Sequence, residues 1–191
     1  MRKATITRST KETTVKVSLN LDGKGLCNIN TTIKYLDHML QQLSVHSFMD
    51  LDVFAEGDLS HHIVEDVAIA LGTAISEALG NRHGIKRFGH AIVPMDETLA
   101  MVAVDLVQRP HVEIKLELSS NKIEDIYTED IPHFLKSFAS SLQFTLHVDI
   151  LKGTNNHHKV ETIFKALALS LKEAWSIEAK RKGVPSSKGK M

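Results

Sequence analysis

The stretch from Ser60 to Val67 reads SHHIVEDV, two adjacent histidines followed closely by a glutamate. If the stretch opens a helix, each residue is rotated by about 100° from the one before it. His61 and Glu65 then lie on nearly the same face, whereas His62 points about 100° away from His61 and is also a neighbour of Glu65. The side chains of these two histidines point too far apart to bind one ion together, but each could bind a separate ion. The competing interpretation is a solvated helix start, because the helix dipole favours a glutamate in the first turn.

The same pattern occurs a second time in the chain. The segment HHIVEDVAIALGTAISEAL begins at His61, and its partner HHKVETIFKALALSLKEAW begins at His157. Upstream, YLDHML around His38 matches DIPHFL around His133, and the strand-like residues 11–21 match residues 96–106. A solvated helix start has no reason to keep His-His-x-x-Glu in both copies while the residues between them diverge. The repeat therefore indicates a tandem duplication with its boundary near residues 82–88, and it favours a metal site.

The repeat also organises the predicted secondary structure. Each half is expected to be a β-β-α-β-α unit, so that the fold is α+β with helices on one face of each sheet. The turn residues Asp22–Gly25 predict a hairpin between the first two strands, and Ser60 is expected to cap the helix that follows it. Strands are predicted at 13–21, 27–33, 51–55, 99–106, 111–118 and 145–151, and helices at 37–47, 61–79, 132–144 and 157 to about 182.

These halves are expected to form one compact domain. Residues 1–85 make up the first half-repeat and residues 86–182 the second. Residues 183–191 are too polar to belong to a core, and we expect them to form a flexible C-terminal tail.

Composition argues against several classes of protein. Among 191 residues, 23 Lys and Arg balance 23 Asp and Glu, which leaves no net charge to attract nucleic acid or an anionic membrane. No apolar run approaches the roughly 18 residues of a membrane span, and the N-terminus lacks an apolar signal core. A single cysteine, Cys27, excludes an intramolecular disulfide. We therefore expect a soluble, cytoplasmic protein without a nucleic-acid or membrane partner.

Histidine is the one residue type in excess, with 11 copies against two tyrosines and one tryptophan. Neutral imidazole binds divalent transition metals near pH 7. The repeat supplies six histidines and two glutamates, enough for two sites of three histidines and one glutamate. Of the remaining histidines, His46 is a pocket candidate because it follows His38 on the same helix. His83, His90 and His111 are expected at the surface or in turns, and His147 within a strand.

These motifs resemble those of the imidazoleglycerol-phosphate dehydratase family of histidine biosynthesis, over nearly the whole chain. The resemblance rests on LDHML at 36–40, HHIVED at 61–66, GIKRFG at 84–89, PMDE at 94–97, RP at 109–110, TLHV at 145–148, NHHKVE at 156–161, FKA at 164–166 and PSSKG at 185–189. The two HHxxE blocks, LDHML and PSSKG are together highly specific.

The resemblance implies a reaction, a cofactor and an assembly. The family dehydrates D-erythro-imidazoleglycerol phosphate to imidazole acetol phosphate without a redox cofactor. It uses two Mn²⁺ ions per active site, which would stabilise an imidazolate form of the substrate. Its subunits assemble through trimers into a 24-subunit homo-oligomer with active sites at the interfaces. The implied fold is ribosomal protein S5 domain 2-like, with two sheets that are each covered by two helices.

The resemblance also implies roles for individual residues. The metal ligands would be His38, His61, His62, Glu65, His133, His157, His158 and Glu161. The substrate phosphate would be held by charge-assisted hydrogen bonds from Arg87, Arg109, Lys165, Ser186 and Lys188. Gln42 would contact the substrate, and Glu12, His46, Asp96 and Glu97 would serve catalysis, with Glu12 as the proton-transfer residue. The C-terminal tail would close over the phosphate and exclude water.

Two other functions suit the same residues. Two metal ions beside a phosphate cradle would also serve a dinuclear phosphoester hydrolase. Alternatively, the histidines could only join subunits, in a metal-buffering or metal-stapled assembly without catalysis.

Overall fold

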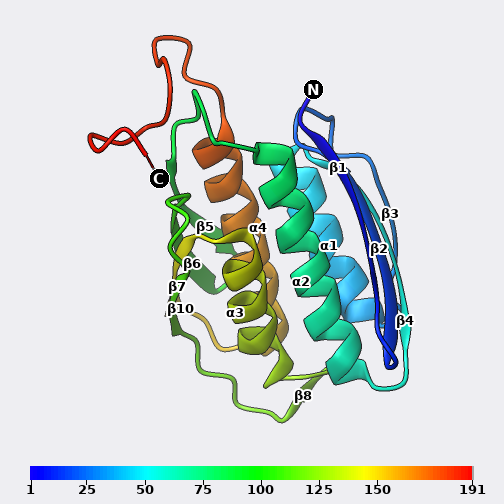
Figure 1. The fold of residues 1–191 in the computed structure, drawn as a ribbon. Coiled ribbons are helices and arrows are strands. Elements are labelled where there is room, and N and C mark those ends of the chain that lie inside the picture. The colour runs from blue at the N-terminus through cyan, green and yellow to red at the C-terminus, as the bar shows by residue number, and fades with distance from the viewer. Residues whose placement is uncertain (191) are drawn as a thin grey trace.

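The structure, a computed structural model, describes residues 1–190 and has four layers in the order sheet, helix pair, helix pair, sheet (Figure 1). The first half comprises β1 (Lys3–Ser9), β2 (Thr13–Asn20), β3 (Cys27–Asn30), α1 (Lys34–Ser47), β4 (Asp50–Gly57) and α2 (Ser60–Leu79). The second comprises β5 (Phe88–Met95), β6 (Thr98–Asp105), β7 (His111–Lys115), β8 (Lys122–Ile123), β9 (Ile126–Tyr127), α3 (Asp130–Leu142), β10 (Thr145–Lys152) and α4 (Asn156–Trp175).

The predicted fold class is confirmed, since each half contains the β-β-α-β-α order within an α+β architecture. Each half also begins with one strand that was not predicted, β1 in the first and β5 in the second. The second half adds the short β8–β9 hairpin, which has no counterpart in the first.

The two large sheets have the same topology. Their strand orders are β1-β2-β4-β3 and β5-β6-β10-β7, and the last pair of each sheet is parallel while the others are antiparallel. The predicted hairpin between β2 and β3 is therefore wrong, because β4 lies between them. The Asp22–Gly25 segment instead crosses the end of the sheet, where the Asp50 carboxylate accepts hydrogen bonds from the backbone of Lys24 and Leu26 at 2.8 and 3.1 Å.

Alternating strand residues and helix faces fill the space between the sheets. In β2, Val15, Val17 and Leu19 point inward and are buried, as period-2 alternation on a half-buried strand requires. Helices α1 and α2 cover the first sheet, and α3 and α4 cover the second. The helix pairs then pack on each other, α1 against α4 and α2 against α3. Residues that lie far apart in the chain thus meet where helices of different halves touch.

Helix α3 lies two residues earlier than predicted, at Asp130–Leu142. Two other helix boundaries differ from the prediction by three residues or more because of long-range contacts. Helix α1 begins at Lys34 rather than Asp37, since the Asp125 carboxylate accepts hydrogen bonds from the backbone of Lys34 and Tyr35. Helix α4 ends at Trp175 rather than near residue 182. Beyond it the chain turns extended at Ser176, and Ile177 forms an antiparallel bridge with Ile85.

A buried arginine stabilises the connection between the halves. Arg82 follows α2, is 0% exposed, and donates hydrogen bonds to the carbonyls of Leu142 and Gln143 at the end of α3. A cation is favoured at a helix C-terminus, where the carbonyls lack partners. Burial lowers the pKa of Arg82 to about 10, so the side chain remains charged at neutral pH.

We expect Arg82→Met to lower the free energy of unfolding by about 3 kcal/mol, because it removes two hydrogen bonds from a charged donor. The measurement is urea denaturation at fixed chain and metal concentrations. Arg181→Met, at an exposed arginine, is the matched control. Equal midpoints for the two variants would contradict the role given to Arg82.

Candidate metal centre

Helices α1 and α4 bring together His38, His157 and Glu161. His157 and Glu161 occupy positions i and i+4 of α4, and His38 faces them from α1. Glu161 Oε2 lies 3.2 Å from Nε2 of His38 and 3.2 Å from Nε2 of His157. The three ligand atoms all lie within 4.8 Å of one another, close enough to share one ion. We call this group the α1–α4 cluster.

Helices α2 and α3 form an equivalent group from His61, Glu65 and His133, which we call the α2–α3 cluster. Its ligand atoms also lie within 4.8 Å of one another. The rings of His61 and His133 have centroids 4.7 Å apart, and His133 Nε2 lies 3.5 Å from Glu65 Oε1. Among residues 1–190, this buried Nε2 atom has no hydrogen-bond partner. A buried polar atom without a partner is costly unless another group satisfies it.

The duplication accounts for both clusters. Each takes a histidine from the first helix of one half and a histidine and glutamate from the second helix of the other half. The structure therefore groups Glu65 with His61 at i,i+4 rather than with His62. The HHxxE motif has this grouping in both copies.

The remaining histidine of each pair lies outside the clusters of its own chain. His62 Nδ1 is 2.8 Å from Asp58 and 3.7 Å from Glu12, and its pKa is raised by the hydrogen bond with Asp58. His158 Nδ1 is 2.8 Å from Glu97, and its Nε2 is 3.8 Å from Asp96. The His158 hydrogen bond holds the pKa of the Glu97 carboxyl far below its usual range.

The helix that carries each pair of histidines begins differently. The Asn155 side chain caps α4 by accepting hydrogen bonds from the backbone of His157 and His158. The predicted cap Ser60 is wrong, because Ser60 is already helical and Leu59 occupies the N-cap position without a side-chain hydrogen bond. Asp58, the residue before this N-cap, accepts a hydrogen bond from the backbone of Leu59 and contacts the ring of His62.

Three more of the predicted residues lie beside the α1–α4 cluster. Gln42 Nε2 is 3.5 Å from His38 Nδ1, and Gln42 Oε1 is 3.2 Å from His46 Nε2. Lys165 Nζ lies 2.7 Å from Glu161 Oε1. Burial, together with the nearby Lys165 ammonium, lowers the pKa of His46. These contacts form a continuous polar row from His46 to Lys165.

Four of the predicted phosphate-binding residues line one hollow of about 540 Å³: Arg87, Arg109, Ser186 and Lys188. Arg87 is held there by Asp105, because its Nε and Nη2 donate hydrogen bonds to the two carboxylate oxygens at 2.6 and 2.9 Å. Its Nη1 donates a third hydrogen bond to the carbonyl of Pro185 at 2.9 Å. That last contact fastens the C-terminal tail to the body of the fold. Lys165, the fifth phosphate candidate, is not among the residues that line this hollow. Residue 191, the end of the predicted tail, lies outside the described residues.

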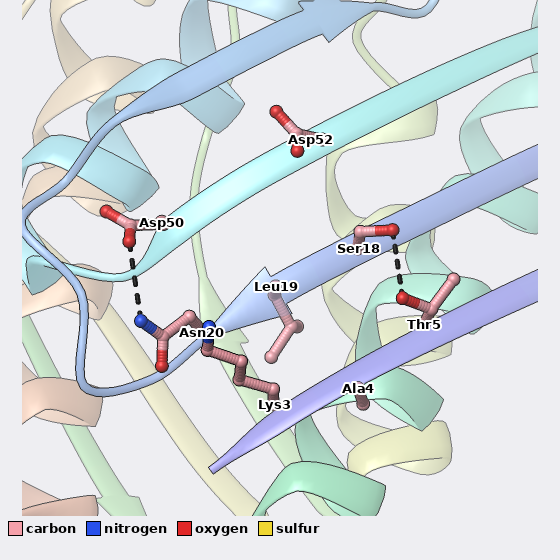
Figure 2. Close-up of a pocket in the computed structure, with 8 residues that line it drawn as sticks. All are labelled: Lys3, Ala4, Thr5, Ser18, Leu19, Asn20, Asp50 and Asp52. Carbon is pink, nitrogen blue, oxygen red and sulfur yellow. Dashed lines mark hydrogen bonds between the residues drawn. The ribbon is translucent and has the colours of Figure 1, made fainter. Parts of the chain in front are cut away.

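A second hollow, of about 280 Å³, lies over the ends of β1, β2 and β4 (Figure 2). It contains none of the predicted site residues. Four of its polar side chains are paired across strands, Thr5 with Ser18 at 3.0 Å and Asn20 with Asp50 at 3.4 Å. These pairings are those of an ordinary sheet surface.

The carboxylates that hold the clustered histidines are not among the residues predicted from the sequence. Asp130 Oδ1 lies 2.6 Å from His61 Nδ1, and Glu124 Oε1 lies 3.2 Å from His157 Nδ1. Asp130 precedes His133 by three residues, so helical spacing could have placed both on one face. Glu124 lies in the β8–β9 hairpin, which has no counterpart in the repeat, so no sequence pattern pointed to it.

Comparison with known proteins gives a consistent result. The family model of imidazoleglycerol-phosphate dehydratase matches residues 31–171. The dehydratase of Clostridium novyi is 48% identical over 191 residues, covering 98% of this chain and 97% of the relative. That of Methanothermobacter thermautotrophicus is 46% identical over 194 residues, covering 100% of this chain and 98% of the relative.

Two crystal structures of such dehydratases share the fold. The Staphylococcus aureus structure has a TM-score of 0.85 at 32% identity and covers 92% of this chain and 99% of its own. The Pyrococcus furiosus structure has a TM-score of 0.86 at 34% identity and covers 97% of this chain and 100% of its own. Within residues 1–190, no helix is long and apolar enough to cross a membrane.

Proposed function

The chain belongs to the imidazoleglycerol-phosphate dehydratase family of histidine biosynthesis, and from that premise we propose how it binds metal and moves a proton. As a family member it is a hydro-lyase that acts on a phosphorylated imidazole substrate. The proposed reaction is the metal-dependent conversion of D-erythro-imidazoleglycerol phosphate to imidazole acetol phosphate. The proposal that the reaction depends on metal is supported by the two His-His-Glu clusters. One lies at each contact between helices of different halves.

The two clusters fit a divalent transition metal. Imidazole nitrogen mixed with carboxylate oxygen suits Mn²⁺, Zn²⁺, Fe²⁺ or Co²⁺, and we propose two Mn²⁺ ions per active site. The unpartnered, buried Nε2 of His133 supports the assignment, because an ion would satisfy it. When bound, the ions supply Lewis-acid polarisation and a template for the substrate.

Each cluster offers three ligands, so we propose that a neighbouring subunit supplies the fourth. His62 and His158 are the two predicted ligands that lie apart from the clusters of their own chain, beside Asp58 and Glu97. Such sites would lie at subunit interfaces of a homo-oligomer, for which we propose a 24-subunit shell built from trimers. We also propose that this assembly works in the cytoplasm.

The other residues bind the substrate and move its proton. We propose that Arg109, Ser186 and Lys188 bind the phosphate, while Arg87 holds the C-terminal tail in place beside them. Lys165, Gln42 and His46 would line the substrate near the α1–α4 cluster, and Asp96 near His158. Glu12 would transfer the proton of the substrate carbon beside the imidazole ring, as general acid–base catalyst. Glu97, with its pKa held low, would position His158.

The test is turnover by the purified chain in the presence of Mn²⁺. We expect the ketone product to form from imidazoleglycerol phosphate and EDTA to abolish its formation. Added Mn²⁺ in excess of the chelator should restore turnover. Release of inorganic phosphate would instead identify a phosphoester hydrolase, and bound metal without any turnover would identify a metal-stapled assembly.

A further inference from the structure

The two clusters have the same ligand types but different surroundings. In the α2–α3 cluster, His61 Nδ1 lies 2.6 Å from Asp130, whose side chain is 1% exposed. The second carboxylate oxygen of Asp130 is buried and has no hydrogen-bond partner among residues 1–190. An imidazole that donates from Nδ1 to a carboxylate presents Nε2 as a more basic ligand, in a fixed orientation.

The equivalent support in the α1–α4 cluster is weaker. His157 Nδ1 lies 3.2 Å from Glu124, whose side chain is 61% exposed. An exposed carboxylate is screened by water and contributes less to the basicity of its partner. The position equivalent to Asp130 in the first half is Tyr35, which donates its hydroxyl to the carbonyl of His157 rather than to its ring.

A cation also competes for the glutamate of the α1–α4 cluster. Lys165 Nζ lies 2.7 Å from Glu161 Oε1, four residues along the same helix. The corresponding position after Glu65 is Ile69, which carries no charge. The Glu161 side chain is only 8% exposed, and its Oε2 also lies 3.2 Å from His38 Nε2. The buried carboxylate is thus already paired with an ammonium group, which would also repel a bound metal ion.

We propose that the two sites hold divalent cations with unequal affinity, and that the α2–α3 site is the tighter because Asp130 supports it while Lys165 weakens the α1–α4 site. This inference rests on the proposed metal-binding function of the clusters. Burial of Glu161 alone would favour the α1–α4 site, but the ammonium at 2.7 Å cancels much of its charge. The α2–α3 site therefore fills first during metal loading and empties last during chelation.

The experiment is a Mn²⁺ titration of the metal-stripped chain, residues 1–191, with free Mn²⁺ measured by electron paramagnetic resonance. We expect two classes of site whose Kd values differ by at least about tenfold, a typical effect of the groups that orient metal ligands. Asp130→Asn should raise the Kd of the tight class by about 10–100-fold and leave the Kd of the weak class unchanged. Glu124→Gln is the matched control, because it changes the other carboxylate and should affect only the weak class, by a smaller factor.

Lys165→Met provides a test that does not depend on the buried Asp130. This variant should lower the Kd of the weak class of site and so reduce the difference between the two Kd values. In crystals of the half-depleted protein, the anomalous signal of Mn²⁺ should remain on His61, Glu65 and His133. One class of equal sites, or equal weakening of both classes by Asp130→Asn, would overturn the inference even if the enzyme turns over normally. Two classes of site in a chain without dehydratase activity would leave the inference standing and reject the proposed function instead.

Discussion

Alanine at His38 or at His133 is expected to lower kcat at least ~10³-fold, since several kcal/mol of transition-state stabilisation by a metal ion corresponds to three or more decades in rate. The two histidines are equivalent in the repeat but belong to different clusters. His38→Ala should therefore remove the ion of the α1–α4 site, and His133→Ala the ion of the α2–α3 site. Each variant should retain about one metal ion per chain by elemental analysis, because each leaves the other cluster intact.

The matched control is His147→Ala. His147 lies in β10, outside both clusters, and it is not among the predicted ligands. We expect this variant to keep both ions and nearly full kcat. Full activity of His38→Ala or His133→Ala with the metal content of the unchanged protein would remove these residues from the ligand set. Loss of both ions from either variant would show that the two sites depend on each other.

The sequence predicted the clusters because their residues are repeated. The HHxxE motif and its upstream histidine occur twice in the same order, and helical geometry favours His61 over His62 as the partner of Glu65 without deciding between them. What it could not predict is which helix faces which. The grouping of His38 with His157, 119 residues away by their numbers, follows from the packing of α1 on α4, and no local pattern encodes that contact.

The structural features that were not predicted, or were predicted wrongly, also depend on contacts between residues far apart in the chain. A turn pattern at Asp22–Gly25 is compatible with a hairpin, but strand pairing is decided by the whole sheet, and β4 forms the better partner for both β2 and β3. Asp125 and Glu124 act on helices of different halves from a hairpin that is absent from the repeat. The early end of α4 likewise depends on the pairing of Ile177 with Ile85. Local periodicity identified the elements, and tertiary contacts determined their ends and neighbours.

The carboxylates Glu12 and Glu97 occupy equivalent positions in the repeat but differ in their partners. Glu97 Oε1 accepts hydrogen bonds from the backbone of Thr154 and Asn155, and Oε2 contacts His158 at 2.8 Å. Within residues 1–190, the Glu12 carboxylate has only a longer contact, 3.7 Å to His62 Nδ1, and it is more exposed than that of Glu97. A carboxylate with few hydrogen bonds is free to accept and return a proton, whereas one that is fully engaged is held in its charged form. This difference favours Glu12 as the proton-transfer residue.

Glu12→Gln should therefore lower kcat by about 10²–10⁴-fold, the usual contribution of a general acid–base catalyst. Because the amide has nearly the shape of the carboxylate, both metal ions should remain bound. Glu97→Gln is the matched variant and should act differently. It should weaken the contact that orients His158 and thereby lower the affinity for metal. Full turnover by Glu12→Gln with unchanged metal content would exclude Glu12 from proton transfer. A loss of activity that excess Mn²⁺ restores would instead assign Glu12 to metal binding through His62, because a missing general base is not replaced by added metal.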